Sequence, residues 1–152
     1  MKPTVRRLPA LFLVLCALLL AAPAAFAQQM VAAARDGVML RASASARAEA
    51  RWSVDKGYPL QVVNRKGAWL QVRDFEGDRA WVLSSRTNRQ AHMVSKASAL
   101  NVRATASTRA RVVARAGYGD VLRTIERRGD WVKVRTSGNT VGWVSRKLVW
   151  GW

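Results

Sequence analysis

A repeat with a constant spacing constrains this chain of 152 residues more than any other feature of its sequence. Identical residues recur 62 positions apart: Arg41 and Arg103, Gly57 and Gly119, Trp69 and Trp131, Val72 and Val134, Arg73 and Arg135, Trp81 and Trp143, and Val82 and Val144. Because the spacing never changes, neither copy has an insertion relative to the other. A long internal repeat of this kind predicts two equivalent structural modules. They lie at about residues 35–88 and 96–150, and the polar segment 86–92 joins them.

Short runs with a period of two occur in both modules. The alternating positions are Val38 and Leu40, Leu60 and Val62, and Leu70 and Val72 in the first module, and Leu100 and Val102, Leu122 and Thr124, and Val132 and Val134 in the second. Such runs, interrupted by glycine and polar turns, are typical of β-strands. The alanine-rich segment 42–51 corresponds to a segment with threonine and serine at 104–111, so we expect an extended loop in both modules. The sequence therefore predicts an all-β protein. Modules of about sixty residues bury only about 60% of their surface, so packing of one against the other would add core.

The first 27 residues have the three parts of a secretory signal peptide. A basic head is followed by an uncharged apolar run at 8–22, by Pro23, and by Ala-Phe-Ala at 25–27, where small residues suit a signal peptidase. The alternative is an uncleaved anchor, because residues 8–27 carry no charge and are about as long as a membrane-spanning helix. We expect cleavage, which leaves a periplasmic or secreted protein without a membrane span.

The chain is strongly basic, with 26 Lys and Arg against 9 Asp and Glu and a formal net charge of +17. The excess is uneven: residues 35–92 carry 11 basic and 6 acidic side chains, and residues 93–152 carry 12 and 3. We therefore expect an anionic partner for the second module above all, unless the charge serves only solubility. Basic strands with aromatic residues can bind single-stranded nucleic acid, but export argues against that partner.

Residues for catalysis or metal binding are scarce. The only cysteine, Cys16, lies in the signal segment, and His92 is the only histidine. Asp74, Glu76 and Asp78 alternate in one turn and could gather a hard cation, but they match no calcium-loop pattern, so we expect a solvated turn. His92 has no second imidazole or thiol with which to share a metal, so we expect an ordinary surface histidine. The sequence predicts no cofactor, no metal and no enzymatic activity.

Matching motifs in the two modules resemble a known family. The second module has Leu-Asn-Val-Arg at 100–103, Gly119, Gly-Asp-Trp-Val-Lys-Val at 129–134 and Gly-Trp-Val-Ser at 142–145; the first has Val-Met-Leu-Arg at 38–41, Gly57, Gly-Ala-Trp-Leu-Gln-Val at 67–72 and Ala-Trp-Val at 80–82. Both modules resemble the bacterial SH3 domain, a small β-barrel of secreted and envelope proteins. The resemblance implies two tandem SH3-like β-barrels, at 28–92 and 93–152, after the signal peptide at 1–27.

The family resemblance also implies a range of functions, and the first module departs from the family pattern in one loop. Such domains resemble wall-targeting modules attached to hydrolases and peptide- or protein-binding modules. The ending Leu-Val-Trp-Gly-Trp at 148–152 and Arg-Trp-Ser-Val at 51–54 look like a tandem subfamily of the envelope. Ala80 stands where the family pattern has glycine, and Ala-Ser-Ala-Ser at 42–45 replaces the more usual loop with Gly-Pro, so the loop conformation of the first module is an open question.

Alternation places the central tryptophans and several cations on one face. If the valines of 131–135 fill the barrel, Trp131, Lys133 and Arg135 share the outer face, and Trp69 and Arg73 do so in the first module. Aromatic and cationic side chains together can stack on a sugar or peptide plane and bind carboxylates or phosphates. The alternative is that the tryptophans cover the barrel mouth or the partner module.

The other aromatic residues have less certain roles. Trp52, Tyr58 and Tyr118 lie before the central strand, where the family resemblance implies a groove, and Trp52 either lines a site or fills the space between modules. Trp81 and Trp143 are expected to be structural. The terminal pair at 150 and 152 is expected to fold back onto the second module, because it would otherwise expose an apolar patch.

These observations are consistent with two functions. The first is an exported, non-catalytic module that binds peptidoglycan, its peptide stems or another anionic envelope polymer, since these offer carboxylates to arginine and sugar faces to tryptophan. The second is an adaptor that binds and positions an envelope protein or enzyme, with charge setting the association rate.

Overall fold

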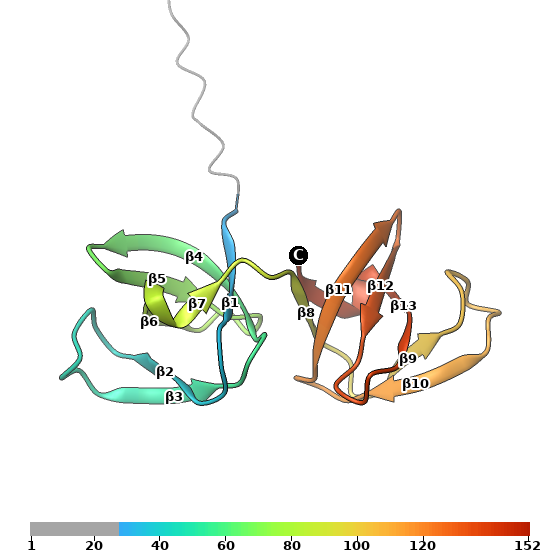
Figure 1. Ribbon diagram of the computed structural model, residues 1–152, viewed down its shortest axis with the longest axis horizontal. Coiled ribbons are helices and arrows are strands. Elements are labelled where there is room, and N and C mark those ends of the chain that lie inside the picture. The colour runs from blue at the N-terminus through green and yellow to red at the C-terminus, as the bar shows by residue number, and fades with distance from the viewer. Residues whose placement is uncertain (1–27) are drawn as a thin grey trace, which may run out of the picture.

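The computed structural model describes residues 28–152, and in them the chain forms two antiparallel sheets of seven strands each (Figure 1). The first sheet contains β1 (Met30–Ala33), β2 (Val38–Arg41), β3 (Ala50–Val54), β4 (Pro59–Lys66), β5 (Trp69–Arg73), β6 (Arg79–Leu83) and β7 (Thr87–Asn88). The second contains β8 (His92–Ser95), β9 (Leu100–Arg103), β10 (Val112–Ala116), β11 (Val121–Arg128), β12 (Trp131–Arg135), β13 (Val141–Ser145) and β14 (Val149–Gly151). The predicted signal peptide lies outside the described residues.

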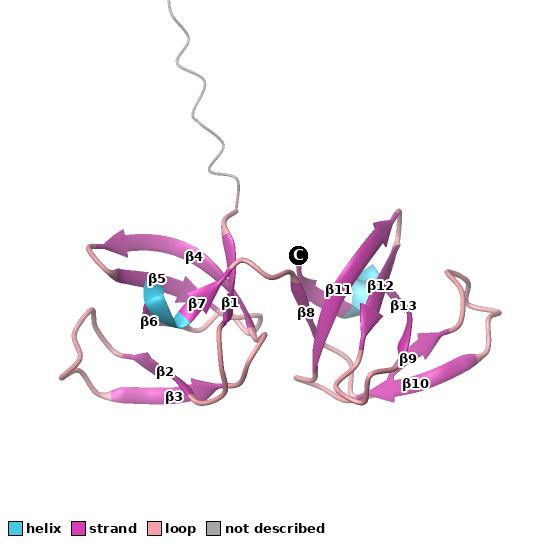
Figure 2. Ribbon diagram, in the orientation of Figure 1, coloured by secondary structure: helices cyan, strands magenta, loops and turns pink. Residues whose placement is uncertain are grey.

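The two sheets have the same topology, as the repeat predicts. Their strand orders are β3-β2-β6-β5-β4-β1-β7 and β10-β9-β13-β12-β11-β8-β14. Two short 3-10 helices, η1 (Ser84–Arg86) and η2 (Arg146–Leu148), occupy equivalent places before the last strand of each sheet (Figure 2). The described part of the chain has no α-helix, so the all-β prediction is confirmed, and no helix in it is long and apolar enough to cross a membrane.

Each sheet wraps around its own apolar core. The inward positions of β5 and β12 are Leu70 and Val72, and Val132 and Val134, all at most 2% exposed. Leu40 and Leu60 complete the centre of the first core, and Leu100, Val102 and Leu122 that of the second. The predicted alternation is therefore correct, because the outward neighbours on β5 and β12 are only partly buried. The two cores are separate clusters, one within each module.

The long loop after β2 has the same conformation as the loop after β9. In the first, the Arg41 guanidinium donates from Nη1 to the carbonyl oxygen of Ala48 at 2.7 Å, and in the second Arg103 donates to Ala110 at 2.8 Å. The backbone hydrogen bonds within the two loops also match. The departures from the family pattern at 42–45 and at Ala80 therefore leave the loop conformation unchanged.

The modules meet along a narrow interface between two turns of the first and one end of the second. The Gly57 turn (φ +85°) packs against the His92 imidazole and Val121. Beside it, the Tyr118 hydroxyl donates to the Glu76 carboxylate at 2.6 Å. His92 is only 8% exposed, so the expectation of an ordinary surface histidine is wrong. The first module's turn covers the imidazole, which no pattern within the histidine's own segment could reveal.

The C-terminal residues fold back onto the second module, as expected. Strand β14 pairs with β8, and the Trp152 backbone N–H donates to the His92 carbonyl at 3.1 Å while its carbonyl accepts from the Thr124 hydroxyl at 2.7 Å. Both terminal indoles are half-buried. In Figure 1 the C-terminus lies near the middle of the molecule, close to β8.

Candidate functional site

Each module has a small groove beside its central tryptophan, and the two grooves occupy equivalent places. The first tryptophan groove has a volume of about 160 Å³ and is lined by Arg35, Gly37, Val38, Met39, Arg41, Trp69, Leu83 and Arg86. The second tryptophan groove has a volume of about 300 Å³ and is lined by Ala99, Asn101, Arg103, Thr108, Trp131, Ser145, Lys147 and Leu148. An indole and cationic side chains therefore line both grooves.

Strand register creates these grooves. Trp131 lies opposite Ser145, and Trp69 lies opposite Leu83, so each indole projects from the outer face of its sheet beside the strand that leads into the 3-10 helix. The helix then contributes a cation, Arg86 in the first groove and Lys147 in the second. Each groove can stack a flat apolar face on an indole and pair a carboxylate with a cation.

Trp131, Lys133 and Arg135 share the outer face of β12, but the structure does not gather them at one point. Lys133 Nζ lies 5.8 Å from the ring centre of Trp143, over which Arg128 also lies at 4.8 Å. The two cations cover Trp143, which is 6% exposed, although it belongs to the outer face of β13. Arg135 lies further along the strand, donates to Asn139 at 2.7 Å and lines a different cavity. The cations beside Trp131 are instead Arg103 and Lys147.

Arg73 has a structural partner on the neighbouring strand. Its guanidinium donates through Nε and Nη2 to Oε1 of Gln61, at 3.1 and 2.6 Å, and Gln61 is 8% exposed. The Trp69 and Arg73 side chains therefore point to the same face but contact different neighbours. Trp81 is half-buried, and Gln71 lies opposite it where Lys133 lies opposite Trp143.

Tyr58 and Tyr118 are brought together across the module interface by Phe75, which the sequence analysis did not single out. The ring centres of Tyr58 and Phe75 are 6.3 Å apart, and those of Phe75 and Tyr118 are 5.2 Å apart in an edge-to-face arrangement. Burial, with the negative charges of Asp74 and Glu76 nearby, raises the pKa of Tyr58 well above its usual range. The contact between Phe75 and Tyr118 thus helps to join the modules.

Trp52 packs against the core of the first module from strand β3 and is partly buried. It lies opposite Leu40 on β2. Trp52 lines neither tryptophan groove. Trp52 thus contacts the core of its own module, and its role in a ligand site stays a prediction.

The acidic turn has a structural explanation. Oδ1 of Asp74 accepts the backbone N–H groups of Glu76 and Asp78 at 3.0 and 2.9 Å, and the Thr136 hydroxyl accepts the Thr140 N–H at the equivalent place in the second module. Burial raises the pKa of Asp74, against the lowering effect of these amides. Carboxylate oxygens of Asp74, Glu76 and Asp78 lie within 4.8 Å of one another, but their arrangement follows from the turn.

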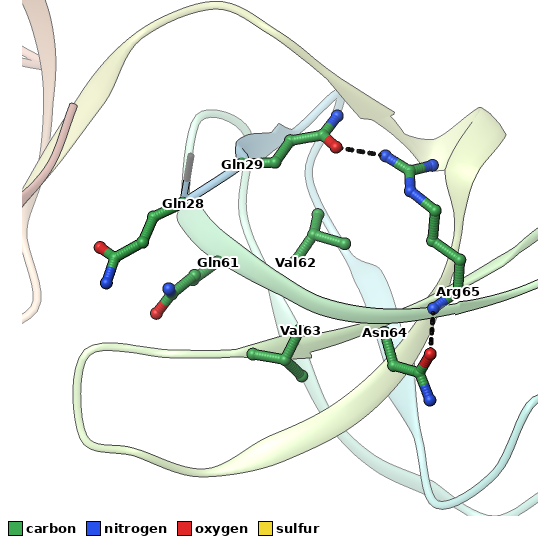
Figure 3. A pocket seen from close by; sticks show the side chains of 7 residues that line it. All are labelled: Gln28, Gln29, Gln61, Val62, Val63, Asn64 and Arg65. Atoms are coloured by element: carbon green, nitrogen blue, oxygen red, sulfur yellow. Dashed lines mark hydrogen bonds between the residues drawn. The ribbon is translucent and has the colours of Figure 1, made fainter. Parts of the chain in front are cut away.

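A larger hollow lies along β4 in the first module. Its volume is about 540 Å³, and its walls are Gln28, Gln29, Gln61, Val62, Val63, Asn64 and Arg65 (Figure 3). Three of its polar side chains are already paired, because Arg65 donates to the Gln29 side chain at 2.6 Å and Gln61 accepts from Arg73. The wall of short polar and branched side chains has no aromatic surface, so this hollow is a weaker candidate than the tryptophan grooves.

Comparison with known proteins identifies the modules. Residues 34–88 and residues 98–149 each match the model of a bacterial SH3 domain. The Bacillus subtilis (strain 168) protein named "Putative N-acetylmuramoyl-L-alanine amidase YrvJ" is 29% identical over an alignment of 126 residues. The match covers 72% of this chain and 24% of that protein. The chain thus spans about a quarter of the length of this relative.

Solved structures with some similarity include an NlpC/P60 family protein from Bacillus cereus and NlpC2 from Trichomonas vaginalis. The first has a TM-score of 0.38 at 10% identity, covering 82% of this chain and 56% of that one. The second has a TM-score of 0.36 at 8% identity, covering 81% and 48%. Two family matches at the predicted spacing, on two sheets of identical topology, settle the family: the chain belongs to the bacterial SH3 domain family and contains two such domains in tandem.

Proposed function

We propose that this protein is an exported, non-catalytic module that binds peptidoglycan through its two tryptophan grooves. The observation that carries the proposal is the repetition of one groove, with an indole and flanking cations, in both modules. Peptidoglycan is itself a repeating polymer, with sugar rings that can stack on indole and peptide stems that carry carboxylates. Two equivalent sites on one chain suit a ligand of this kind, because linked sites raise the effective affinity for a repeating ligand.

The relationship to YrvJ supports the same class of ligand. That protein is named as an amidase of N-acetylmuramoyl-L-alanine, which is a linkage of peptidoglycan, and the similarity covers 72% of this chain. The similar region is only 24% of that protein, so an amidase centre need not fall within it. We infer that the shared region contributes binding rather than cleavage.

Co-sedimentation of residues 28–152 with purified, insoluble peptidoglycan tests the proposal. We expect retention at low salt that weakens as salt increases, because cations line both grooves. Trp131→Ala should reduce retention, and Lys147→Gln should reduce it and flatten its salt dependence. Absence of retention at low salt would exclude peptidoglycan as the ligand and favour the adaptor alternative.

A matched substitution distinguishes the effect of losing the tryptophan of the groove from the effect of losing any partly buried tryptophan. Trp152→Ala removes a side chain of the same size and similar burial that lines neither groove. Retention of this variant should equal that of the parent chain. If Trp131→Ala and Trp152→Ala bind equally well, the second tryptophan groove is not the binding site.

A further inference from the structure

Three side chains with basic nitrogen atoms form a row across the second sheet, at the interface between the modules. In the strand register, His92 of β8 lies opposite Arg123 of β11, and Arg123 lies opposite Arg135 of β12. Directly opposite residues project from the same face with Cβ atoms about 5 Å apart, so the row presents two guanidinium groups and an imidazole side by side. Like charges at such positions oppose one another and destabilise the sheet.

The first module avoids this arrangement at the equivalent positions. There the row is Met30, Gln61 and Arg73, and the single cation is held by two hydrogen bonds to the neutral Gln61. The fold therefore does not require cations in the row. Among residues 28–152 the one ion pair joins Arg128 to Glu126, so neither Arg123 nor Arg135 has a carboxylate within ion-pairing distance.

The row forms one wall of a cavity of about 510 Å³ between the modules. Its lining is Asp55, Lys56, Gln90, His92, Gly119, Asp120, Val121, Arg123, Arg135, Thr136 and Ser137. Lys56 adds a third permanent cation from the first module. The two carboxylates already accept backbone amides of turns, Asp55 from Gly37 at 3.3 Å and Asp120 from Gly117 at 2.7 Å. Hydroxyl groups of Thr136 and Ser137 add further polar atoms to the wall.

We propose that this inter-module cleft is a binding site for an oxyanion, either a carboxylate or a tetrahedral anion such as phosphate or sulfate. Cations that line a cleft and have no carboxylate within ion-pairing distance focus the electrostatic field and attract an anion. The bound group would supply the negative charge that the row of His92, Arg123 and Arg135 lacks, and guanidinium groups suit a planar or tetrahedral oxyanion. Residues of both modules line the cleft, so the anion would also fix the modules relative to one another. The site is separate from the tryptophan grooves.

His92 makes the test direct, because it is the only histidine of the chain. Its Nδ1 lies 2.8 Å from the Gln90 carbonyl oxygen, to which it donates, and its ring lines the cleft, so the His92 resonances report on an anion bound there. The imidazole resonances of untagged residues 28–152 should be followed by NMR as sodium sulfate replaces sodium chloride at constant ionic strength. We expect a saturable shift of the His92 signals. A shift that grows without saturation, or none, would overturn the proposal.

Matched arginine substitutions and a pair of peptides complete the experiment. Arg123→Gln should weaken sulfate binding about tenfold, as loss of a charged hydrogen bond does. Arg111→Gln, an equal change of charge at an exposed residue just before β10, should leave it unchanged. Equal weakening by both variants would mean that only overall charge matters and would contradict a site. An N-acetylated dipeptide with a free carboxyl group, compared with its C-terminal amide, distinguishes a peptide carboxylate from a tetrahedral anion as the natural ligand.

Discussion

His92 is the residue whose environment differs most from what its sequence context indicates. Burial lowers its pKa, and the positive charges of Arg123 and Lys56 lower it further. The Gln90 carbonyl oxygen raises the pKa, because it accepts a hydrogen bond from Nδ1–H. Asp55 and Asp120 are the acidic groups of the same cleft, and each accepts a backbone amide of a turn. The folded protein therefore disfavours the charged imidazole more than the unfolded chain does.

This difference predicts acid destabilisation as the pH falls below about 7. With a folded-state pKa below the usual value of about 6.5, the unfolded state binds more protons in this range, so the free energy of unfolding falls as pH decreases. His92→Asn, whose amide nitrogen can replace Nδ1 as a donor, should lack this decrease. Chemical denaturation at several pH values, read by circular dichroism, measures it. Parallel pH profiles for the two proteins would contradict the assignment.

Asp74 allows a second test at the scale of one residue. Asp74→Asn retains the oxygen that accepts two turn amides and removes a buried charge next to Glu76 and Asp78. Because burial raises the folded-state pKa of Asp74, the parent chain should lose stability relative to this variant as pH increases above about 4. Asp74→Ala loses both hydrogen bonds and should cost about 1–3 kcal/mol of unfolding free energy at neutral pH. Equal stability of the Ala and Asn variants would show that the hydrogen bonds do not matter.

At the scale of the strands, one pair of equivalent positions has different residues for a steric reason. A Cβ atom on Gly142 would lie 2.7 Å from both the Arg103 carbonyl oxygen and Val102 Cγ1, whereas Ala80 occupies the equivalent position and is 2% exposed. The approach of β13 to β9 therefore requires glycine in the second module only.

Reciprocal substitutions test this difference. Gly142→Ala should destabilise the protein by about 1–3 kcal/mol, the usual cost of overpacking. Ala80→Gly should cost about 0.5–1 kcal/mol from the greater backbone freedom in a strand, and about 0.8 kcal/mol more because it removes a buried methyl group from the first core. Thermal and chemical denaturation measure both. No loss of stability in Gly142→Ala would contradict the geometry.

The strands themselves could be predicted from the sequence, because alternation and the 62-residue repeat are local or periodic signals. Their β-bulges could not. The strand register shifts at Val63 in β4 and at Ile125 in β11, and both apolar side chains are exposed as a result. Alternation also placed Trp131, Lys133 and Arg135 correctly on one face, but which neighbours they contact depends on β9, β13 and η2, which are distant along the chain.

At the scale of the molecule, the interface between the modules determines whether the cleft exists. Gly57 and Gly119 are equivalent turn residues with positive φ, +85° and +81°, so alanine strains both backbones by about 1 kcal/mol. A Cβ atom on Gly57 would also lie 2.7 Å from the His92 imidazole and 3.2 Å from Val121, whereas one on Gly119 would meet nothing within 4 Å.

The two alanine variants should therefore differ in module arrangement. Gly57→Ala should alter the His92 resonances and the relative orientation of the modules, as measured by residual dipolar couplings. Gly119→Ala should leave both nearly as in the parent chain. Each module should remain folded in both variants, as backbone spectra would report. An unchanged relative orientation of the modules in Gly57→Ala would contradict the described interface. The sequence could not predict this interface, because its contacts link turns of different modules through shape and not through a repeated pattern.

The central claim is that two equivalent tryptophan grooves bind peptidoglycan together. The most direct measurement is the apparent affinity of residues 28–152 for purified peptidoglycan, compared among Trp69→Ala, Trp131→Ala and the double variant, with all three shown to be folded. Each single variant should lose the avidity of two linked sites, which amounts to about tenfold or more, and the double variant should show almost no binding. Binding by the double variant equal to that of the parent chain would contradict the claim.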